Sequence, residues 1–413
     1  MAWYYRPFCR RLLGMTALVG FIWSCNPEKN EPVEPTLPAL MAQKLEDTLR
    51  TKDVGFAFTI YEGTELIAKG SGGFQSRKAD PEGKKNFTPD TKLHIASMTK
   101  TLTAMAFLKL AQQKGLHTTD RIAKYLPPAW AQGAGVNQIT FGDLLTHRSG
   151  IVGLGSNCQN GSFTENIYSG LRQLIAKGVT SRGNYCYQNA NFGLFRVLVP
   201  SILGYSFTGN ETADASATEK QYLAFLQQEI FEKAGVSNAT ITHPSGNPTY
   251  TYNVPISDFQ TGWNPGNFAQ TLGGYGMYLT ATEAGKIYAE ALSGGRNTVM
   301  TGALADSLLT KNLGCYKVTS GTGTYYYHDG WWYSGLSANA QGLRTIWMKL
   351  PNNLTCVLFV NALQWRSGSP VFPFNSGNIV GFVANAYAQA LQVRGMRIGA
   401  EAFVFEIEHP EPH

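Results

Sequence analysis

The sequence predicts an α/β protein of the α+β type, in which both ends of the chain build one antiparallel sheet and an all-α region is inserted between them. Two hairpin patterns stand near opposite ends of the chain, and each has a helix pattern beside it. The residues between the hairpins show helical periodicity and capping signals instead. The chain has 413 residues, of which 43% are hydrophobic and 15% are charged, and it can bury a large core.

The first hairpin pattern follows a helix predicted over residues 40–50. Glu62-Gly63 provides a turn between the first strand and a returning strand over residues 66–74. One face of the first strand is predicted to be buried, because apolar residues alternate along it at Val54, Phe56, Phe58 and Ile60.

The second hairpin pattern lies near the other end, where strands over residues 344–350 and 354–360 flank Pro351-Asn352-Asn353. A helix follows over residues 379–393, and Gly395 is a suitable stop for it. The two hairpins and the two terminal helices together predict a sheet with helices packed against it.

The middle of the chain is predicted to be mostly helical. Thr140 with Asp143 and Thr280 with Glu283 each form a capping-box pattern at the start of a helix. A third helix, which ends at Gly235, has an apolar face at Tyr222, Leu226, Ile230 and Phe231. The junction of this helical region with the sheet is expected to form a cleft.

Residues 1–24 have the pattern of a bacterial signal peptide, because Arg10-Arg11 precede an apolar stretch that is too short for a permanent membrane helix. Cys25 stands in the position of a lipoprotein cysteine, which favours lipidation over simple secretion or a retained anchor. We therefore expect an exported lipoprotein, periplasmic or at the cell surface and anchored in the membrane. Three further divisions follow, namely a Pro-rich tether, one domain and a tail, over residues 25–38, 39–395 and 396–413.

The charge pattern gives no sign of a nucleic-acid partner. The net charge of +6 includes three arginines of the predicted signal peptide, so the rest of the chain carries about +3. Lys84-Lys85 is too short a basic run to follow a phosphate backbone. The sequence also contains no C-x-x-C or H-E-x-x-H pattern, so neither a metal nor another cofactor is expected.

Four cysteines follow the two near the N-terminus, an even number that agrees with an oxidising compartment. The most local pairing would form two disulfides, Cys158 with Cys186 and Cys315 with Cys356. The alternative is four reduced, buried thiols that act as small apolar residues.

Ser97 and Lys100 form an S-x-x-K pattern at the start of an apolar helix. Three-residue spacing places both side chains on one face of the helix. A serine hydroxyl needs a neighbouring base to become a nucleophile, and burial makes a lysine such a base because it disfavours the charged form. The pattern by itself also fits a capped buried helix whose lysine extends to solvent.

Three further segments resemble motifs of one family and occur in the family's order. Residues 141–150 resemble its LLTHTSG stretch, Tyr187-Gln188-Asn189 its Y-x-N motif, and His328-Asp329-Gly330, on a strand predicted over residues 325–332, its K/H-x-G triplet. Together with Ser97 and Lys100, they make the chain similar to serine β-lactamases, D-Ala-D-Ala carboxypeptidases and related esterases over residues 40–391. The resemblance implies a β-lactamase/transpeptidase-like fold.

The resemblance also implies a role for each matching residue. Ser97 would attack a carbonyl to form an acyl-enzyme, with Lys100 and Tyr187 sharing the role of base. Asn189 would orient the substrate carbonyl or Lys100, and His328 would tune the proton transfer of Tyr187. The main-chain N–H groups of Ser97 and of Trp331, the residue after the triplet, would form the oxyanion hole. Gly330 completes the triplet at this substrate and oxyanion site. His147 is structural in this family. The sequence has no G-x-S-x-G, which argues against the alternative nucleophile elbow.

The third motif departs from the lactamase form. His328 replaces a lysine, and Asp329 replaces a Ser or Thr that would bind a substrate carboxylate. A second anion would repel that carboxylate, and Trp331-Trp332 adds bulk that is expected to narrow the acyl pocket. We therefore expect an ester, amide or peptide substrate without a closely bound carboxylate, rather than efficient hydrolysis of penicillins.

Other functions remain alternatives at this point. A D-Ala-D-Ala carboxypeptidase is one, because an H-x-G triplet also occurs among such peptidases, and a β-lactamase is another. A surface lipoprotein that binds a peptide or glycan without turnover is an alternative of a different class. The expected partners are a small-molecule or peptide substrate and the membrane, and no protein partner is predicted.

Overall fold

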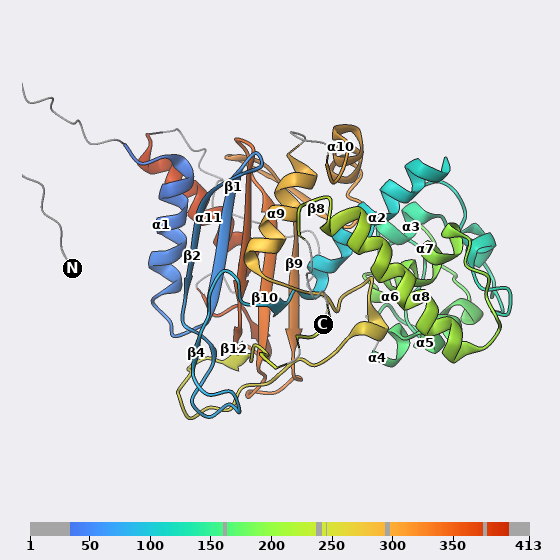
Figure 1. Cartoon of the computed structure of the whole chain (residues 1–413), viewed down its shortest axis with the longest axis horizontal. Helices are drawn as coiled ribbons and strands as arrows, with labels where there is room; N and C mark the ends of the chain where they lie inside the picture. Colours follow the sequence, from blue (N-terminus) through green and yellow to red (C-terminus); the bar gives the residue numbers. More distant parts are fainter. Residues whose placement is uncertain are drawn as a thin grey trace, which may run out of the picture. The chain divides into compact units, whose positions relative to one another are not determined.

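A nine-stranded sheet, counted over the described residues, takes its central strands from both ends of the chain (Figure 1). The computed structural model describes residues 34–159, 163–236, 242–244, 246–293, 298–374 and 378–395. Antiparallel pairing joins, in this order, β2 (Glu65–Gly72), β1 (Phe56–Glu62), β11 (Leu354–Val360), β10 (Gly342–Lys349), β9 (Gly323–Tyr333) and β8 (Tyr316–Ser320). The other strands are β6 (Tyr252–Asn253), β12 (Ala362–Arg366) and β13 (Ser369–Val371). The predicted fold class and both predicted hairpins are confirmed.

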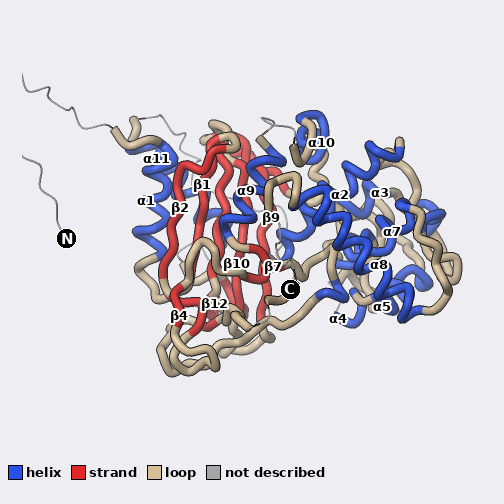
Figure 2. The backbone as a smooth tube through the Cα atoms, viewed as in Figure 1, coloured by secondary structure: helices blue, strands red, loops and turns tan. Residues whose placement is uncertain are grey.

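Helices cover both faces of the sheet. One face packs on the two terminal helices, α1 (Leu37–Leu49) and α11 (Ile379–Val393), and the other face packs on α9 (Ala281–Leu292) (Figure 2). The expectation of one buried face for β1 is therefore wrong, since Ala57 and Thr59 are buried against α9 while Phe58 is buried on the opposite side. A central strand between two helix layers has no face left for solvent.

The inserted region is helical around a buried central helix, α2 (Thr99–Lys114), which starts at the sheet. Its other α-helices are α3 (Phe141–Leu145), α4 (Phe163–Asn166), α5 (Tyr168–Lys177), α6 (Asn189–Gly193), α7 (Phe195–Leu203), α8 (Glu211–Leu226) and α10 (Gly302–Thr310). Short helical turns are η1 (Ala96–Met98), η2 (Ala123–Tyr125), η3 (Val136–Gln138), η4 (Gln227–Phe231) and η5 (Ala269–Thr271). Two small strand pairs complete the fold, β3 (Phe74–Ser76) with β4 (Lys85–Asn86) and β5 (Leu93–His94) with β7 (Tyr278–Leu279).

Local sequence signals set several element boundaries. The capping boxes at Thr140 and Thr280 are present at the starts of α3 and α9. Asn352 and Asn353 have φ values of 59° and 57°, which gives the β10–β11 hairpin a tight turn of the type that suits the twist of its strands. The helix α1 starts at Leu37, capped by Thr36, so the last two residues assigned to the tether are helical.

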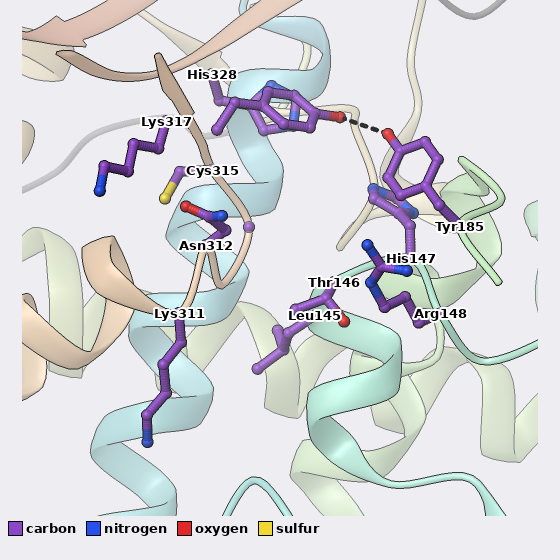
Figure 3. Close-up of a pocket in the computed structure, with 12 residues that line it drawn as sticks. Leu145, Thr146, His147, Arg148, Tyr185, Lys311, Asn312, Cys315, Lys317 and His328 are labelled. Atoms are coloured by element: carbon purple, nitrogen blue, oxygen red, sulfur yellow. Dashed lines mark hydrogen bonds between the residues drawn. The ribbon is translucent and has the colours of Figure 1, made fainter. Parts of the chain in front are cut away.

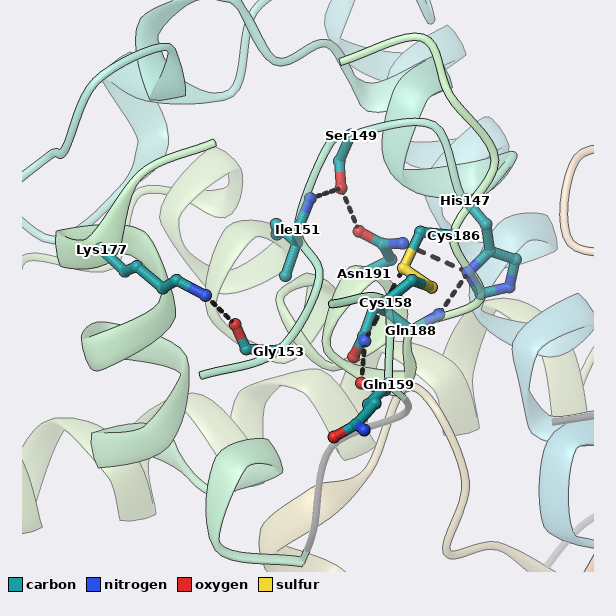
Figure 4. The surroundings of a disulfide bond; sticks show 10 residues. All are labelled: His147, Ser149, Ile151, Gly153, Cys158, Gln159, Lys177, Cys186, Gln188 and Asn191. Carbon is teal, nitrogen blue, oxygen red and sulfur yellow. Dashed lines mark hydrogen bonds between the residues drawn. A yellow bond between two sulfur atoms is a disulfide. The ribbon is translucent and has the colours of Figure 1, made fainter. Parts of the chain in front are cut away.

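Two of the four internal cysteines form a disulfide. Cys158 and Cys186 are bonded, as the most local pairing predicts (Figure 4). The predicted bond between Cys315 and Cys356 is wrong, because both are free and buried. Cys356 lies on the face of β11 that meets α1 and α11, whereas Cys315 belongs to the hydrophobic cluster on the other side of the sheet.

The lipidation site and the signal peptide lie outside the described residues, as does the C-terminal tail. Within the described residues, no helix combines the length and the apolar character that crossing a bilayer requires.

Alkylation of the unfolded, unreduced protein is expected to modify Cys315 and Cys356 but not Cys158 or Cys186. The separation of Cys315 and Cys356 by the sheet is the reason, and peptide mass mapping is the measurement. A cross-linked peptide that contains Cys315 and Cys356 would contradict this arrangement of the sheet.

Candidate active site

Ser97 lies in η1, the turn between β5 and α2, and two side chains reach its hydroxyl. The Lys100 Nζ atom is 2.9 Å and the Tyr187 hydroxyl 2.8 Å from Ser97 Oγ. The residue before the serine, Ala96, has a φ of 46°, a left-handed conformation that costs a non-glycine residue backbone strain. Ser97 itself keeps partial exposure, whereas Lys100 and Tyr187 are buried.

The Lys100 amine is fully buried and has two partners besides Ser97. It donates to Asn189 Oδ1 at 2.7 Å and to the Gly274 carbonyl oxygen at 2.8 Å. Burial lowers the pKa of Lys100 well below its ordinary value, although the charge of Asp329 opposes this shift. In its neutral form this amine would have two N–H groups for these two oxygens and a lone pair for the Ser97 hydroxyl.

Tyr187 presents a protonated hydroxyl to Ser97. Burial raises the pKa of Tyr187 above its ordinary value. The ring of His147 stacks on the Tyr187 ring with centroids 4.4 Å apart, and His147 Nδ1 accepts the Gln188 N–H at 3.1 Å. Figure 4 shows His147 beside the disulfide of Cys186, the residue before Tyr187. His147 therefore positions the tyrosine, in agreement with the structural role that the resemblance implies.

A segment that the sequence analysis missed holds the lysine from the other side. The Gly273 carbonyl accepts a 2.7 Å hydrogen bond from Thr103, and the Gly274 carbonyl accepts the bond from Lys100. The segment passes so close to α6 that a Cβ atom at Gly274 would lie 2.7 Å from the Asn189 carbonyl oxygen. Two adjacent glycines in a loop are a sequence signal of close backbone approach, although the partner cannot be predicted from them.

The strand β9 brings the third motif next to Ser97. A Cβ atom at Gly330 would lie 2.3 Å from Thr345 Oγ1 and 2.5 Å from the Ile95 carbonyl oxygen, so only glycine fits there. His328 is 2% exposed, and burial lowers its pKa to about 3, with a further contribution from Lys100. The imidazole is therefore neutral at pH 7.

Asp329 faces away from this site. Neighbouring side chains alternate along a strand, and the Asp329 carboxylate forms a 2.8 Å salt bridge with the buried Arg344 of β10. The Arg344 guanidinium also lies over the Trp331 ring, 5.1 Å from its centroid. Asp329 therefore does not line the site directly, although its charge still acts on Lys100. The Trp331 side chain lies on the same face of β9 as Asp329, away from Ser97.

Trp332 lies on the same face of β9 as His328. Its ring is 4.7 Å from the Tyr275 ring and 5.5 Å from the His94 ring, measured between centroids. Trp332 is partly exposed, whereas Tyr275 and His94 are buried. Of the Trp331-Trp332 pair, only Trp332 therefore lies on the face of β9 that carries His328.

His328 also lines a pocket of about 150 Å³. Figure 3 shows it between the loop that carries His147 and Arg148 and the segment that carries Cys315 and Lys317. Tyr185 and Tyr316, which also line it, share a hydrogen bond of 3.2 Å between their hydroxyl groups. Among the described residues, no group of three or more His, Cys, Asp and Glu side chains could hold a metal ion.

The structure thus brings Ser97, Lys100, Tyr187 and Asn189 together and places His328 and Gly330 beside them. The main-chain oxyanion roles of Ser97 and Trp331 stay predictions. A serine with a buried lysine and tyrosine, between an antiparallel sheet and a helical region, defines the class of penicillin-recognising serine proteins.

The chain belongs to the β-lactamase family, whose model matches residues 40–371. It is 24% identical over 318 residues to PbpX of Bacillus subtilis (strain 168), which carries a penicillin-binding-protein name, and the match covers 69% of this chain and 74% of that one. Two solved structures share the fold. FmtA from Staphylococcus aureus matches with a TM-score of 0.62 at 18% identity, covering 85% of this chain and 87% of that one. A β-lactamase/D-alanine carboxypeptidase from Pseudomonas syringae matches with a TM-score of 0.58 at 15% identity, covering 86% and 98%.

Substituting Gly330→Ala is expected to destabilise the protein by about 1–3 kcal/mol, because the added methyl group overpacks the contact between β9 and the Ser97 turn. Chemical unfolding measures this change. Gly302→Ala is the control, since a Cβ atom there meets nothing within 4 Å. Equal stability of the two variants would contradict the close packing of β9 against η1.

Stability is expected to fall as the pH is lowered from about 6.5 to about 3. Burial lowers the pKa of His94 and of His328 to about 3 in the folded protein, so over this range the unfolded chain binds protons that the folded protein does not. Urea unfolding at several pH values measures the slope. His94→Gln is expected to reduce the slope, and the exposed His117→Gln is the control; equal slopes in the two variants would contradict a buried neutral His94.

Proposed function

We propose that this protein is a serine hydrolase that forms an acyl-enzyme on Ser97. The observation that carries the proposal is the pair of contacts at Ser97 Oγ, a depressed-pKa lysine at 2.9 Å and a protonated tyrosine at 2.8 Å. A base beside a serine hydroxyl is the requirement for nucleophilic catalysis. A site of this kind acts by covalent chemistry on an acyl group.

The hydrogen bonds support an order of proton transfer. The neutral Lys100 amine takes the proton of the Ser97 hydroxyl as Ser97 Oγ attacks the substrate carbonyl carbon. Tyr187 donates to the same oxygen before the attack. As the bond to the leaving group breaks, Tyr187 gives a proton to the leaving group and takes one back from the protonated Lys100 amine. Asn189 holds the lysine through its 2.7 Å hydrogen bond and keeps the lone pair directed to Ser97.

The proposed substrate is an ester, amide or peptide that brings no carboxylate close to the third motif. His328, and not Asp329, supports this substrate class, because a neutral imidazole does not provide the positive charge that a lysine would provide there. A D-Ala-D-Ala carboxypeptidase or a β-lactamase is the alternative within the family. A lipoprotein that binds a ligand without turnover is the alternative outside it.

We also infer export and attachment to the membrane through Cys25, with the domain in the periplasm or at the cell surface. The pattern of residues 1–24 supports this inference. The disulfide between Cys158 and Cys186 agrees with an oxidising compartment.

Intact-mass spectrometry tests the proposed function after incubation with a p-nitrophenyl ester, a D-Ala-D-Ala peptide and a penicillin. An acyl adduct or product is expected with the wild type and absent in Ser97→Ala. Lys100→Met and Tyr187→Phe are each expected to slow acylation by roughly 10²–10⁴-fold, because they remove a proton-transfer group.

Matched controls are Lys114→Met, which changes an exposed lysine of the same helix, and Tyr185→Phe, which removes a neighbouring hydroxyl. Preference for the ester or the peptide identifies an esterase or a peptidase, and rapid turnover of the penicillin would reject the proposed substrate class. If no substrate reacts in a manner that depends on Ser97, the hydrolase proposal fails and the binding protein is favoured.

A further inference from the structure

A second pocket, of about 330 Å³, lies in the helical region and is lined by residues of α5, α7 and α8 and of the turn η5. None of Ser97, Lys100, Tyr187, Asn189 and His328 lines it. Polar side chains line much of its wall, including Ser169, Ser216 and Gln270. The pocket is therefore separate from the candidate active site and suited to a polar molecule.

The most unusual residue of this pocket is Arg196 of α7. Its side chain is 1% exposed, and its guanidinium donates to the main-chain oxygens of Asn166 and Leu272 at 3.3 and 3.4 Å, near the upper limit for a hydrogen bond. Within the described part of the chain, it forms no salt bridge. Burial also lowers the pKa of Arg196, to about 10. A buried cation without a carboxylate partner is costly, and a bound anion would reduce that cost.

The pocket also carries a carboxylate at a distance from the guanidinium. Glu219 of α8 lines the same space, and burial raises its pKa while the charge of Arg196 opposes the shift. Over the described residues, Glu219 forms no salt bridge either, so the two groups are not in direct contact, although the charge of each acts on the pKa of the other. The other acidic group of the wall, Glu211, is paired with Arg172 at 3.0 Å.

We propose that this pocket binds a free α-amino acid, with the carboxylate of the ligand on Arg196 and its ammonium group on Glu219. An arginine presents a planar fork that matches a carboxylate, and a carboxylate accepts from an ammonium group. Ser169, Ser216 and Gln270 line the same pocket and make its wall polar around such a ligand. Size agrees as well, since a protein cavity of about 150 Å³ holds a benzene molecule.

A ligand with only one of the two charges fits less well. Acetate would pair with Arg196 but would leave Glu219 half-buried without a cation, and methylamine would do the reverse. The two charges together therefore select a zwitterion over either single ion.

Isothermal titration calorimetry on the full-length protein tests this site with glycine, L-alanine, D-alanine, acetate and methylamine. Saturable binding of at least one amino acid is expected, with acetate and methylamine at least 10-fold weaker. Glu219→Gln and Ser216→Tyr are each expected to weaken amino-acid binding at least 10-fold, the first by removing the charge and the second by filling the pocket. Ala224→Tyr, at an exposed position of α8 that does not line the pocket, is the control.

Ser97→Ala is expected to bind the amino acid as the wild type does, so the result is independent of the proposed hydrolase activity. Arg196 donates to two main-chain oxygens, so its replacement would disturb the fold as well as the pocket. The test therefore uses the α8 variants Glu219→Gln and Ser216→Tyr, and circular dichroism checks that both are folded. The proposal is overturned if no amino acid binds saturably, if acetate binds equally well, or if both α8 variants retain wild-type affinity.

Discussion

The burial of the Lys100 amine is the constraint on which the candidate site depends. An amine that leaves water needs protein acceptors for its N–H groups, and Asn189 and Gly274 supply them. Asn189 starts α6, and Gly274 belongs to a loop far away in the sequence. The lysine therefore fixes two separate parts of the helical region relative to Ser97, and the adjacent glycines allow them to approach.

The Ser97 turn is fixed to the sheet by a second set of contacts. Thr345 of β10 donates to the Ile95 carbonyl at 2.9 Å, and Tyr288 of α9 donates to the Met98 carbonyl at 2.8 Å. Trp347 of β10 donates to Thr101 in the first turn of α2 at 3.0 Å. Ser97, the proposed nucleophile, is thus held by the sheet, and Lys100, the proposed base, by the helical region. The turn η1 and the first residues of α2 join them and set their distance.

Local patterns predict the elements whose signals lie within a few residues. The bounds of α11 and the capping boxes of α3 and α9 follow from periodicity and from side chains three residues apart. The contact of Gly274 with Lys100 and the separation of Cys315 from Cys356 depend on how distant segments pack, which such patterns do not encode. The direction of Asp329 is different, because placing His328 towards Ser97 already places its neighbour on the opposite face of the strand.

The histidine at position 328 bears on both the base and the substrate. Burial lowers the pKa of His328, and the charge that Lys100 carries when it is protonated lowers it further. A lysine in that position would compete with Lys100 for a proton, whereas a neutral imidazole leaves the charge of Lys100 free to change during the reaction. The same neutrality removes the cation that would hold a substrate carboxylate. A substrate that brings no carboxylate to this point loses nothing by the exchange, so the proposed substrate class rests on His328 rather than on Asp329.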